Sequence, residues 1–294
     1  MSSGILVTGA SGLIGSELVP LLEPGSSRLV TTAQSGSNRA DHYRCDLSVP
    51  REAAALLDAV RPDTIIHLAG GTSPDRHELY RKNVLTTIHV LGAAAALARR
   101  PYCIVLGSAA EYGDAASGPT SESAPLRPAT EYGRAKLAQT TLAESICASA
   151  GLPLTVLRPF NVVSARLSAA TALGHLREQL LRGAGRERAV ECGRLDVVRD
   201  FVPLTAVVET IRRLTVRPAP GQALNVCSGI GLDLGAILLA MAAKLGVTVQ
   251  VVPRPDLLAI AAVPWSVGDP SRLLRATGLQ IEATAEGIAE ILVG

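Results

Sequence analysis

The sequence predicts an α/β fold in which a doubly wound parallel sheet is joined to a smaller C-terminal lobe. Short apolar runs rich in β-branched residues alternate with longer helical patterns over the first half of the chain. Such runs are typical of parallel strands that helices cover on both faces. A glycine-rich turn directly follows the first run. With 294 residues, 48% hydrophobic and 18% charged, the chain is long and apolar enough to bury a large core.

Each element follows from this alternation. The expected strands cover residues 4–8, 28–32, 64–68, 102–106 and 154–158, with helices between them at 13–22, 51–59, 79–98 and 132–150. The alternation stops after Pro159. Later elements are expected as helices at 172–181, 204–214 and 234–245, a strand at 248–252 and a final helix, while the arginine-rich stretch 182–194 is expected to be a solvated face. We therefore expect a first domain over residues 1–163, to which the chain returns at about 200–225, and a lobe made of residues 164–199 and 226–294.

Composition excludes several classes of protein. The net charge of +2 gives no electrostatic reason to expect nucleic acid or a membrane surface as a partner. No apolar run reaches the ~18 residues that span a bilayer. Five cysteines without a C-x-x-C pair are typical of reduced thiols, so we expect a cytoplasmic protein without a secretory signal. The five histidines have no metal-ligand spacing, and no metal is expected.

The glycine-rich turn at residues 8–15 links the first expected strand to the first expected helix. Gly9 would allow a tight turn, Gly12 would let a pyrophosphate approach the backbone, and Gly15 would let helix and strand pack closely. Phosphates would bind at the helix N-terminus, where unpaired N–H groups and the helix dipole favour anions. The sequence therefore predicts a Rossmann-like dinucleotide site formed by Gly9, Ser11, Gly12, Leu13, Ile14 and Gly15.

The end of the second expected strand helps to choose the dinucleotide. An NAD site usually has an acid there, which binds the ribose 2′-hydroxyl. Here the strand ends Thr-Thr-Ala-Gln, without an acid, and Ser35, Asn38 and Arg39 follow. Hydroxyl, amide and guanidinium donors suit a 2′-phosphate. We therefore expect NADP(H) as the cofactor, with NAD as the alternative.

Three residues are predicted to be catalytic: Ser108, Tyr132 and Lys136. Tyr132 and Lys136 are four residues apart on an expected helix, so they share a face. A nearby ammonium favours the phenolate, so Lys136 is expected to lower the pKa of Tyr132 and make it a general acid or base. Ser108 follows the strand at 102–106, and ligands bind at the carboxyl ends of parallel strands.

Together these motifs resemble those of extended short-chain dehydrogenases/reductases, the family that also contains nucleotide-sugar epimerases and dehydratases. The matching segments are the glycine turn, Cys-Asp-Leu at 45–47, Ile-His-Leu-Ala-Gly at 66–70, Asn83, the Ser108 segment, the Tyr132/Lys136 pair, and the segments 157–161, 199–202 and 225–229. The resemblance covers nearly the whole chain.

This resemblance implies roles for further residues. The cofactor would contact Asp46, Leu47, Leu68, Ala69, Gly70, Asn83, Pro159 and Phe160, with Asp46 at the adenine and Phe160 at the nicotinamide. The substrate would contact Ser108, Glu111, Asn161 and Arg199. Two copies would pair as a homodimer through the helices at 79–98 and 132–150.

The resemblance also narrows the reaction. A 4,6-dehydratase of the family carries Thr-Asp-Glu where this chain has Ser108-Ala109-Ala110, which excludes dehydration. An epimerase keeps NAD bound, whereas the missing acid after the second strand favours a reductase that consumes NADPH. The segments 107–113 and 193–201 resemble those of GDP-4-keto-6-deoxy-mannose reductases. We therefore expect NADPH-dependent reduction of the 4-keto group of a nucleotide-linked 4-keto-6-deoxyhexose.

In this reaction Tyr132 would supply a proton to the carbonyl oxygen, Ser108 would hydrogen-bond that oxygen, and Lys136 would hold the nicotinamide ribose. A second arginine, which family members use to bind a diphosphate, is missing from 260–265. Either Arg254 or Arg272 would replace it, or the substrate would be held with one arginine fewer, or the substrate would not be a nucleotide diphosphate sugar. The alternatives are an epimerase with bound NAD, a reductase of a carrier-free ketone, and a non-catalytic dinucleotide-binding sensor. Such sensors typically lose the Tyr/Lys pair that this chain keeps.

Overall fold

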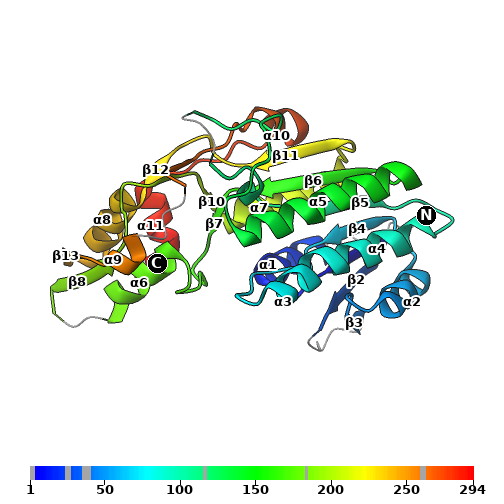
Figure 1. The fold of residues 1–294 in the computed structure, drawn as a ribbon, viewed down its shortest axis with the longest axis horizontal. Coiled ribbons are helices and arrows are strands. Elements are labelled where there is room, and N and C mark those ends of the chain that lie inside the picture. The colour runs from blue at the N-terminus through cyan, green and yellow to red at the C-terminus, as the bar shows by residue number, and fades with distance from the viewer. Residues whose placement is uncertain (1–3, 24–27, 35–40, 115–117, 183–184, 259–262) are drawn as a thin grey trace.

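A computed structural model describes residues 4–23, 28–34, 41–114, 118–182, 185–258 and 263–294. Its centre is a seven-stranded parallel sheet in the order β11-β6-β5-β4-β1-β2-β3 (Figure 1). The strands are β1 (Gly4–Thr8), β2 (Arg28–Ala33), β3 (His42–Arg44), β4 (Thr64–His67), β5 (Tyr102–Leu106), β6 (Leu154–Pro159) and β11 (Gln222–Val226). The predicted doubly wound fold is confirmed. The strand order reverses between β1 and β4, and such a switch point opens a crevice at the carboxyl ends of the strands.

Helices cover both faces of this sheet. One face packs against α2 (Pro50–Val60), α4 (Thr86–Ala95) and α5 (Glu131–Ala150), and the other against α1 (Leu13–Leu22) and α7 (Leu204–Val216). Successive residues of β5 point to opposite faces: Cys103 and Val105 pack on the side of α2, α4 and α5, and Ile104 packs on the side of α1 and α7. Because both faces are covered, the five strands β1, β2, β4, β5 and β6 are buried at nearly every position and are rich in apolar and β-branched residues. This is why their positions can be recognised in the sequence.

The smaller lobe, at the left of Figure 1, has a core of its own. It contains α6 (Ala172–Arg182), α8 (Leu234–Leu245), α11 (Ala285–Val293) and two parallel strands, β8 (Glu187–Cys192) and β13 (Thr248–Pro253). The remaining short elements are β7 (Asn161–Val163), β9 (Val198–Arg199), β10 (Phe201–Pro203), β12 (Leu232–Asp233), α9 (Pro255–Leu258) and β14 (Trp265–Ser266).

The expected division of the chain needs one correction. The chain does return to the sheet, as β11. However, not all residues after 226 belong to the lobe, because Leu273 of α10 (Ser271–Thr277) and Ile281 are buried in the core of the sheet. The C-terminal segment therefore contributes to both parts of the molecule.

Two elements differ from the sequence prediction in the first domain and the lobe. The expected helix at 79–98 is divided into α3 (Arg76–Tyr80), a π-helical turn (Arg81–Leu85) and α4. The hydroxyl of Thr87 donates to the carbonyl oxygen of Asn83 at 2.7 Å next to this turn. The arginine-rich stretch contains β8, in which only Val190 and Cys192 are buried. Because only two of its positions are buried, β8 contains no apolar run, and the sequence pattern does not predict it as a strand.

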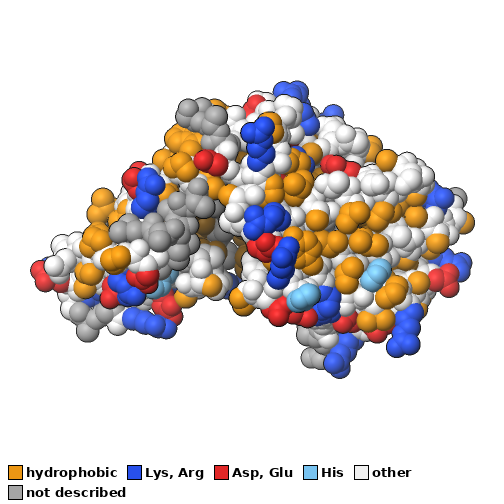
Figure 2. Space-filling view, viewed as in Figure 1, with side chains coloured by type: hydrophobic (Ala, Val, Ile, Leu, Met, Phe, Trp, Pro, Cys, Tyr) orange, Lys and Arg blue, Asp and Glu red, His pale blue; other side chains and the backbone are white. Residues whose placement is uncertain are grey.

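Hydrophobic side chains gather over α4 and α5 on the face shown in Figure 2. Leu85, next to α4, and Leu142 of α5 are both partly exposed. These are the helices through which two copies are expected to pair, and that pairing stays a prediction. Among the described residues, no helix combines the length and the apolar character that crossing a membrane requires.

Candidate active site

A cavity of about 1140 Å³ lies at the carboxyl ends of the central strands and extends to the lobe; Figure 2 shows the notch between the two parts. Cavities for one small ligand usually measure roughly 300–1,000 Å³, so this one has room for a dinucleotide and a second molecule. Most of the predicted site residues line it, namely Gly9, Gly12, Leu13, Ile14, Gly15, Leu68, Gly70, Ser108, Tyr132, Lys136, Pro159, Phe160, Asn161 and Arg199.

At two positions of the glycine turn, Gly9 and Gly15, a side chain would collide with backbone atoms. Gly9 has a φ of +67°, and a Cβ there would lie 2.7 Å from the backbone nitrogen of Ala69, just after β4. A Cβ on Gly15 would lie 2.5 Å from the carbonyl oxygen of Gly9. Helix α1 begins after Gly12 without a side-chain cap, so the N–H groups of its first turn are available to an anion. This cradle fits the pyrophosphate of a dinucleotide.

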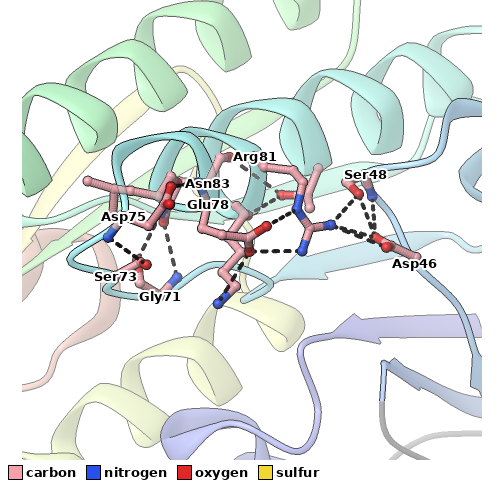
Figure 3. Close-up of polar contacts among 11 residues, drawn as sticks. Asp46, Ser48, Gly71, Ser73, Asp75, Glu78, Arg81 and Asn83 are labelled. Atoms are coloured by element: carbon pink, nitrogen blue, oxygen red, sulfur yellow. Dashed lines mark hydrogen bonds and ion pairs between the residues drawn. The ribbon is translucent and has the colours of Figure 1, made fainter.

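Asp46 lies in a cluster of charged side chains outside the cavity wall (Figure 3). Its carboxylate accepts hydrogen bonds from the hydroxyl of Ser48 at 2.7 Å and from the guanidinium of Arg81 at 3.2 Å. Arg81 also donates to both carboxylate oxygens of Glu78, at 2.8 and 3.0 Å. The charge of Arg81 is therefore neutralised by two carboxylates, those of Asp46 and Glu78. That Asp46 contacts an adenine stays a prediction.

Other predicted cofactor residues support the site or lie elsewhere. Ser11, Leu47 and Ala69 are outside the cavity wall, and Leu47 is buried in the core beneath α2 and α4. Asn83 is fully buried; its amide donates to the carbonyl oxygen of Gly71 at 2.8 Å and accepts from the N–H of Gly71 at 3.2 Å. Asn83 thus holds the cavity-lining turn after β4 without lining the cavity. Ser35, Asn38 and Arg39 lie outside the described residues.

Ser108, Tyr132 and Lys136 come together at the carboxyl end of β5. The hydroxyl of Ser108 lies close enough to the phenol of Tyr132 to influence its pKa. One turn along α5, the ammonium of Lys136 donates to the carbonyl oxygen of Leu106 at 2.6 Å and to the side-chain oxygen of Gln139 at 2.7 Å. The structure thus places a proton-bearing hydroxyl pair and a cation on the same wall of the cavity.

The pKa shifts differ from the expectation that Lys136 lowers the pKa of Tyr132. Burial raises the pKa of Tyr132, the hydrogen bond from Ser108 opposes the rise, and the charge of Glu111 adds to it. Burial lowers the pKa of Lys136 to about 8, because the ammonium loses hydration. Tyr132 therefore keeps its proton at neutral pH, as a proton donor must.

Glu111 does not reach the cavity, contrary to the expectation that it contacts substrate. Its side chain is fully buried. Its carboxylate accepts hydrogen bonds from the N–H of Ser108 at 2.8 Å, the hydroxyl of Thr140 at 3.0 Å and the guanidinium of Arg158 at 2.9 Å. The short 3-10 turn Ala109–Glu111 directs this side chain into the protein.

Arg199 and Asn161 also line the cavity. The guanidinium of Arg199 donates to the carbonyl oxygen of Val198 at 2.8 Å and to that of Val263, and it pairs with no carboxylate among the residues that the structure describes. Burial lowers the pKa of Arg199, and the charge of Arg194 lowers it further. A half-buried guanidinium without a paired carboxylate favours an anionic ligand.

Of Arg254 and Arg272, the two arginines expected as a second phosphate contact, one lines the cavity and the other does not. Arg254 lines the cavity, where it pairs with Glu191 and, at 3.0 Å, with Asp256. Arg272 lies outside the cavity wall and is 3.5 Å from the carboxylate of Glu122. Only Arg254 is therefore placed to meet a ligand.

Sequence reasoning missed several residues of the cavity wall, including Gly71, Thr72, Thr130, His175 and Arg194. The signal for Gly71 and Thr72 is their position after a strand of the parallel sheet, where ligands bind. Thr130 caps α5 by accepting a hydrogen bond from the N–H of Gly133 at 3.0 Å. His175 and Arg194 come from the lobe, and no local pattern predicts that they face the sheet.

Within the described part of the chain, no group of three or more His, Cys, Asp or Glu residues is arranged to hold a metal ion. His67 is fully buried between the hydroxyls of Thr8 and Thr87, at 2.8 and 2.9 Å. Burial lowers the pKa of His67 to about 3, so its ring is neutral.

Comparison with known proteins agrees with this geometry. Residues 5–227 match the model of the NAD dependent epimerase/dehydratase family. The chain is 31% identical over 263 residues to the dTDP-6-deoxy-L-talose 4-dehydrogenase (NAD(P)(+)) of Kitasatospora kifunensis. This alignment covers 86% of this chain and 83% of that protein. It is 28% identical over 298 residues to the GDP-6-deoxy-D-mannose reductase of Pseudomonas aeruginosa, with 97% and 94% covered.

A solved structure is similar along the whole chain. The structure of RMD from Pseudomonas aeruginosa complexed with NADPH has a TM-score of 0.85 and 25% sequence identity, with 100% of this chain and 97% of that chain covered. The family match includes the glycine turn, Ser108, Tyr132 and Lys136. This chain therefore belongs to the NAD dependent epimerase/dehydratase family and is an NAD(P)-dependent oxidoreductase.

Proposed function

We propose that this enzyme uses NADPH to reduce the 4-keto group of a nucleotide-linked 4-keto-6-deoxyhexose. One observation carries the proposal: a single cavity contains both the Ser108–Tyr132 hydroxyl pair, which suits a carbonyl oxygen, and the Arg199 guanidinium, which suits a diphosphate. The names of two relatives support the substrate class, because they state a dTDP-linked and a GDP-linked 6-deoxy sugar.

The proton chemistry follows from the geometry of α5 and the Ser108 turn. A dinucleotide held by the glycine turn would supply the hydride for the carbonyl carbon. Tyr132 donates its phenolic proton to the carbonyl oxygen, while the hydroxyl of Ser108 hydrogen-bonds that oxygen. The ammonium of Lys136, one turn along the same helix, adds a cation to this wall of the cavity. Gln139 and the carbonyl of Leu106 hold this ammonium in place.

The end of β2 supports NADPH as the cofactor. Its described residues, 31–34, include no acid that would accept a hydrogen bond from a ribose 2′-hydroxyl. Arg44 of β3 is paired in register with Ala33, and its guanidinium donates to the carbonyl oxygen of Gln34 at 3.1 Å. A cation at this strand end favours the 2′-phosphate of NADPH.

The same turn that carries Ser108 disfavours dehydration. Ala109 and Ala110 supply neither an acid nor a base, and the carboxylate of Glu111 is occupied by three hydrogen-bond donors. Epimerisation uses the same tyrosine but returns the hydride to the sugar, so it consumes no cofactor. Cofactor consumption therefore separates the proposed reduction from epimerisation.

The proposal is tested by incubating the enzyme with dTDP-, GDP- and UDP-linked 4-keto-6-deoxyhexoses and following the loss of NADPH absorbance, with NADH in parallel. We expect stoichiometric oxidation, faster with NADPH, for at least one nucleotide sugar. Sugar interconversion without net oxidation would instead identify an epimerase. Oxidation driven only by carrier-free ketones would overturn the nucleotide-linked substrate, and tighter binding of NADH would overturn the choice of cofactor.

Replacing Arg199 with methionine should lower kcat/KM for the nucleotide sugar by roughly 10- to 100-fold, because a charge-assisted contact to a diphosphate is lost. The loss should fall mainly on KM, since Arg199 does not touch the reacting carbonyl. The Arg188→Met variant is the matched control: Arg188 also donates to a backbone carbonyl, that of Leu180 at 3.0 Å, but it lies outside the cavity wall. Equal KM values for Arg199→Met and the wild type would show that Arg199 does not bind substrate.

A further inference from the structure

A buried ion pair lies directly behind Ser108. Nε of Arg158, in β6, is 2.9 Å from Oε2 of Glu111, and the two side chains are 4% and 0% exposed. Taking two charges out of water costs hydration energy that an apolar pair of similar volume would not lose, so a buried ion pair is weak evidence for stability. The contacts of the pair point to another role.

We propose that Glu111 and Arg158 form a positioning pair that ties the Ser108 turn, helix α5 and strand β6 together and so holds Ser108 and Tyr132 in their reactive arrangement. This inference rests on the catalytic roles proposed above for Ser108 and Tyr132. Neither member of the pair lines the cavity, so both act through other residues.

Glu111 connects the two catalytic segments. One carboxylate oxygen accepts the N–H of Ser108 at 2.8 Å, and the other accepts the hydroxyl of Thr140 at 3.0 Å. Thr140 lies one turn after Lys136 on α5. The strand end leaves space for this carboxylate, because a Cβ on Gly107 would lie 2.5 Å from Oε1. Glu111 thus fixes the backbone of Ser108 relative to the helix that carries Tyr132 and Lys136.

Arg158 supports the opposite side of the turn. Its guanidinium lies 5.2 Å from the ring centroid of Tyr112 and donates to the Tyr112 hydroxyl at 3.3 Å. That hydroxyl donates to the side-chain oxygen of Asn225 at 2.7 Å. The Tyr112 ring stacks on Phe160, a residue of the cavity wall, at a centroid distance of 6.3 Å. The pair is therefore linked both to Ser108 and, through Tyr112, to Phe160, the residue expected at the nicotinamide.

The carboxylate also acts on its neighbours through its charge. The titratable groups around Glu111 are Arg158 on β6, Tyr132 and Lys136 on α5, and Tyr112 on its own turn. Its charge raises the pKa of both Tyr132 and Lys136, in addition to the effect of burial on each. A negative charge at Glu111 thus helps Tyr132 to keep the proton that it donates.

The first test replaces the pair by an apolar one, Glu111→Leu with Arg158→Met. An apolar pair of similar volume leaves no unpaired charge in the core, but the N–H of Ser108 and the hydroxyl of Thr140 lose an acceptor. We therefore expect a folded protein whose melting temperature is moderately lower than that of the wild type. We expect NADPH affinity to change less than about twofold and kcat to fall at least about tenfold, since the Ser108 turn is no longer fixed. A double variant that is stable and keeps its full kcat would overturn the proposal.

The second test needs no sugar substrate and so remains valid if the proposed function fails. Tyrosinate absorbance is titrated for Glu111→Gln and for the wild type, and each curve is corrected with the matching Tyr132→Phe protein. Removing the carboxylate charge should lower the pKa of Tyr132. Glu209→Gln is the control, because Glu209 is a carboxylate paired with Arg212 and Arg213 outside the cavity wall. An unshifted Tyr132 in Glu111→Gln, or an equal shift in Glu209→Gln, would contradict the proposal.

Discussion

Replacing Tyr132 with phenylalanine is expected to lower kcat by roughly 10²–10⁴-fold, the range for loss of a positioned general acid. The substitution removes the hydroxyl that faces Ser108 and leaves the ring on α5. Burial raises the pKa of Tyr132, so the phenol is protonated at neutral pH, and activity of the wild type should fall as the pH rises through that pKa. Steady-state kinetics across a pH series measure both effects.

The matching control for this experiment is Tyr102→Phe. Tyr102 is also buried, and its hydroxyl is 2.7 Å from that of Thr155, but it begins β5 at the end opposite Ser108. This variant should lose some stability and keep kcat. NADPH binding, measured by fluorescence, should weaken by at most roughly 10-fold in Tyr132→Phe, because one hydroxyl contributes only ~0.5–1.5 kcal/mol. If Tyr132→Phe turns over as fast as the wild type, another group donates the proton.

A Gly15→Ala substitution should raise the Kd for the dinucleotide by roughly 10- to 100-fold, since overpacking typically costs ~1–3 kcal/mol. The new Cβ would lie 2.5 Å from the carbonyl oxygen of Gly9 and 2.7 Å from the Cα of Ala10. Both are backbone atoms, so α1 must move away from the turn and its first N–H groups leave the pyrophosphate site. Isothermal titration with NADPH measures the loss.

The control is Gly92→Ala, the same substitution in another helix. Gly92 is an exposed residue of α4, and a Cβ there would meet no atom within 4 Å. Alanine in an open helical position should stabilise the protein by roughly 0.5–1 kcal/mol relative to glycine, without changing cofactor binding. Equal NADPH affinities for Gly15→Ala and Gly92→Ala would mean that the glycine turn does not hold the pyrophosphate.

The sequence by itself determined the central strands of the sheet, the order of its main helices and the position of the reactive wall. Buried parallel strands are rich in apolar and β-branched residues, so β1, β2, β4, β5 and β6 appear as separate runs. The glycine turn and the Tyr132/Lys136 pair are equally local, because they depend on spacing within a few residues. A signal of this kind needs no knowledge of distant contacts.

Other features were decided only by the tertiary structure. Glu111 follows Ser108 by three residues, and that spacing suits a substrate contact as well as an internal one. Its pairing with Arg158 and Thr140, which are 47 and 29 residues away in the sequence, decides that it is internal. Likewise, Leu273 and Ile281 lie in the core of the sheet and not in the lobe.

The protonation states of Tyr132 and Lys136 were likewise decided only by the tertiary structure. An isolated tyrosine–lysine pair predicts a lowered tyrosine pKa, whereas burial and the charge of Glu111 raise it here. Periodicity and motif spacing record which residues are neighbours along a helix or strand. Burial, counter-ions and the direction of a side chain depend on segments distant in the sequence, and these determine the charge and the contacts of each group in the cavity.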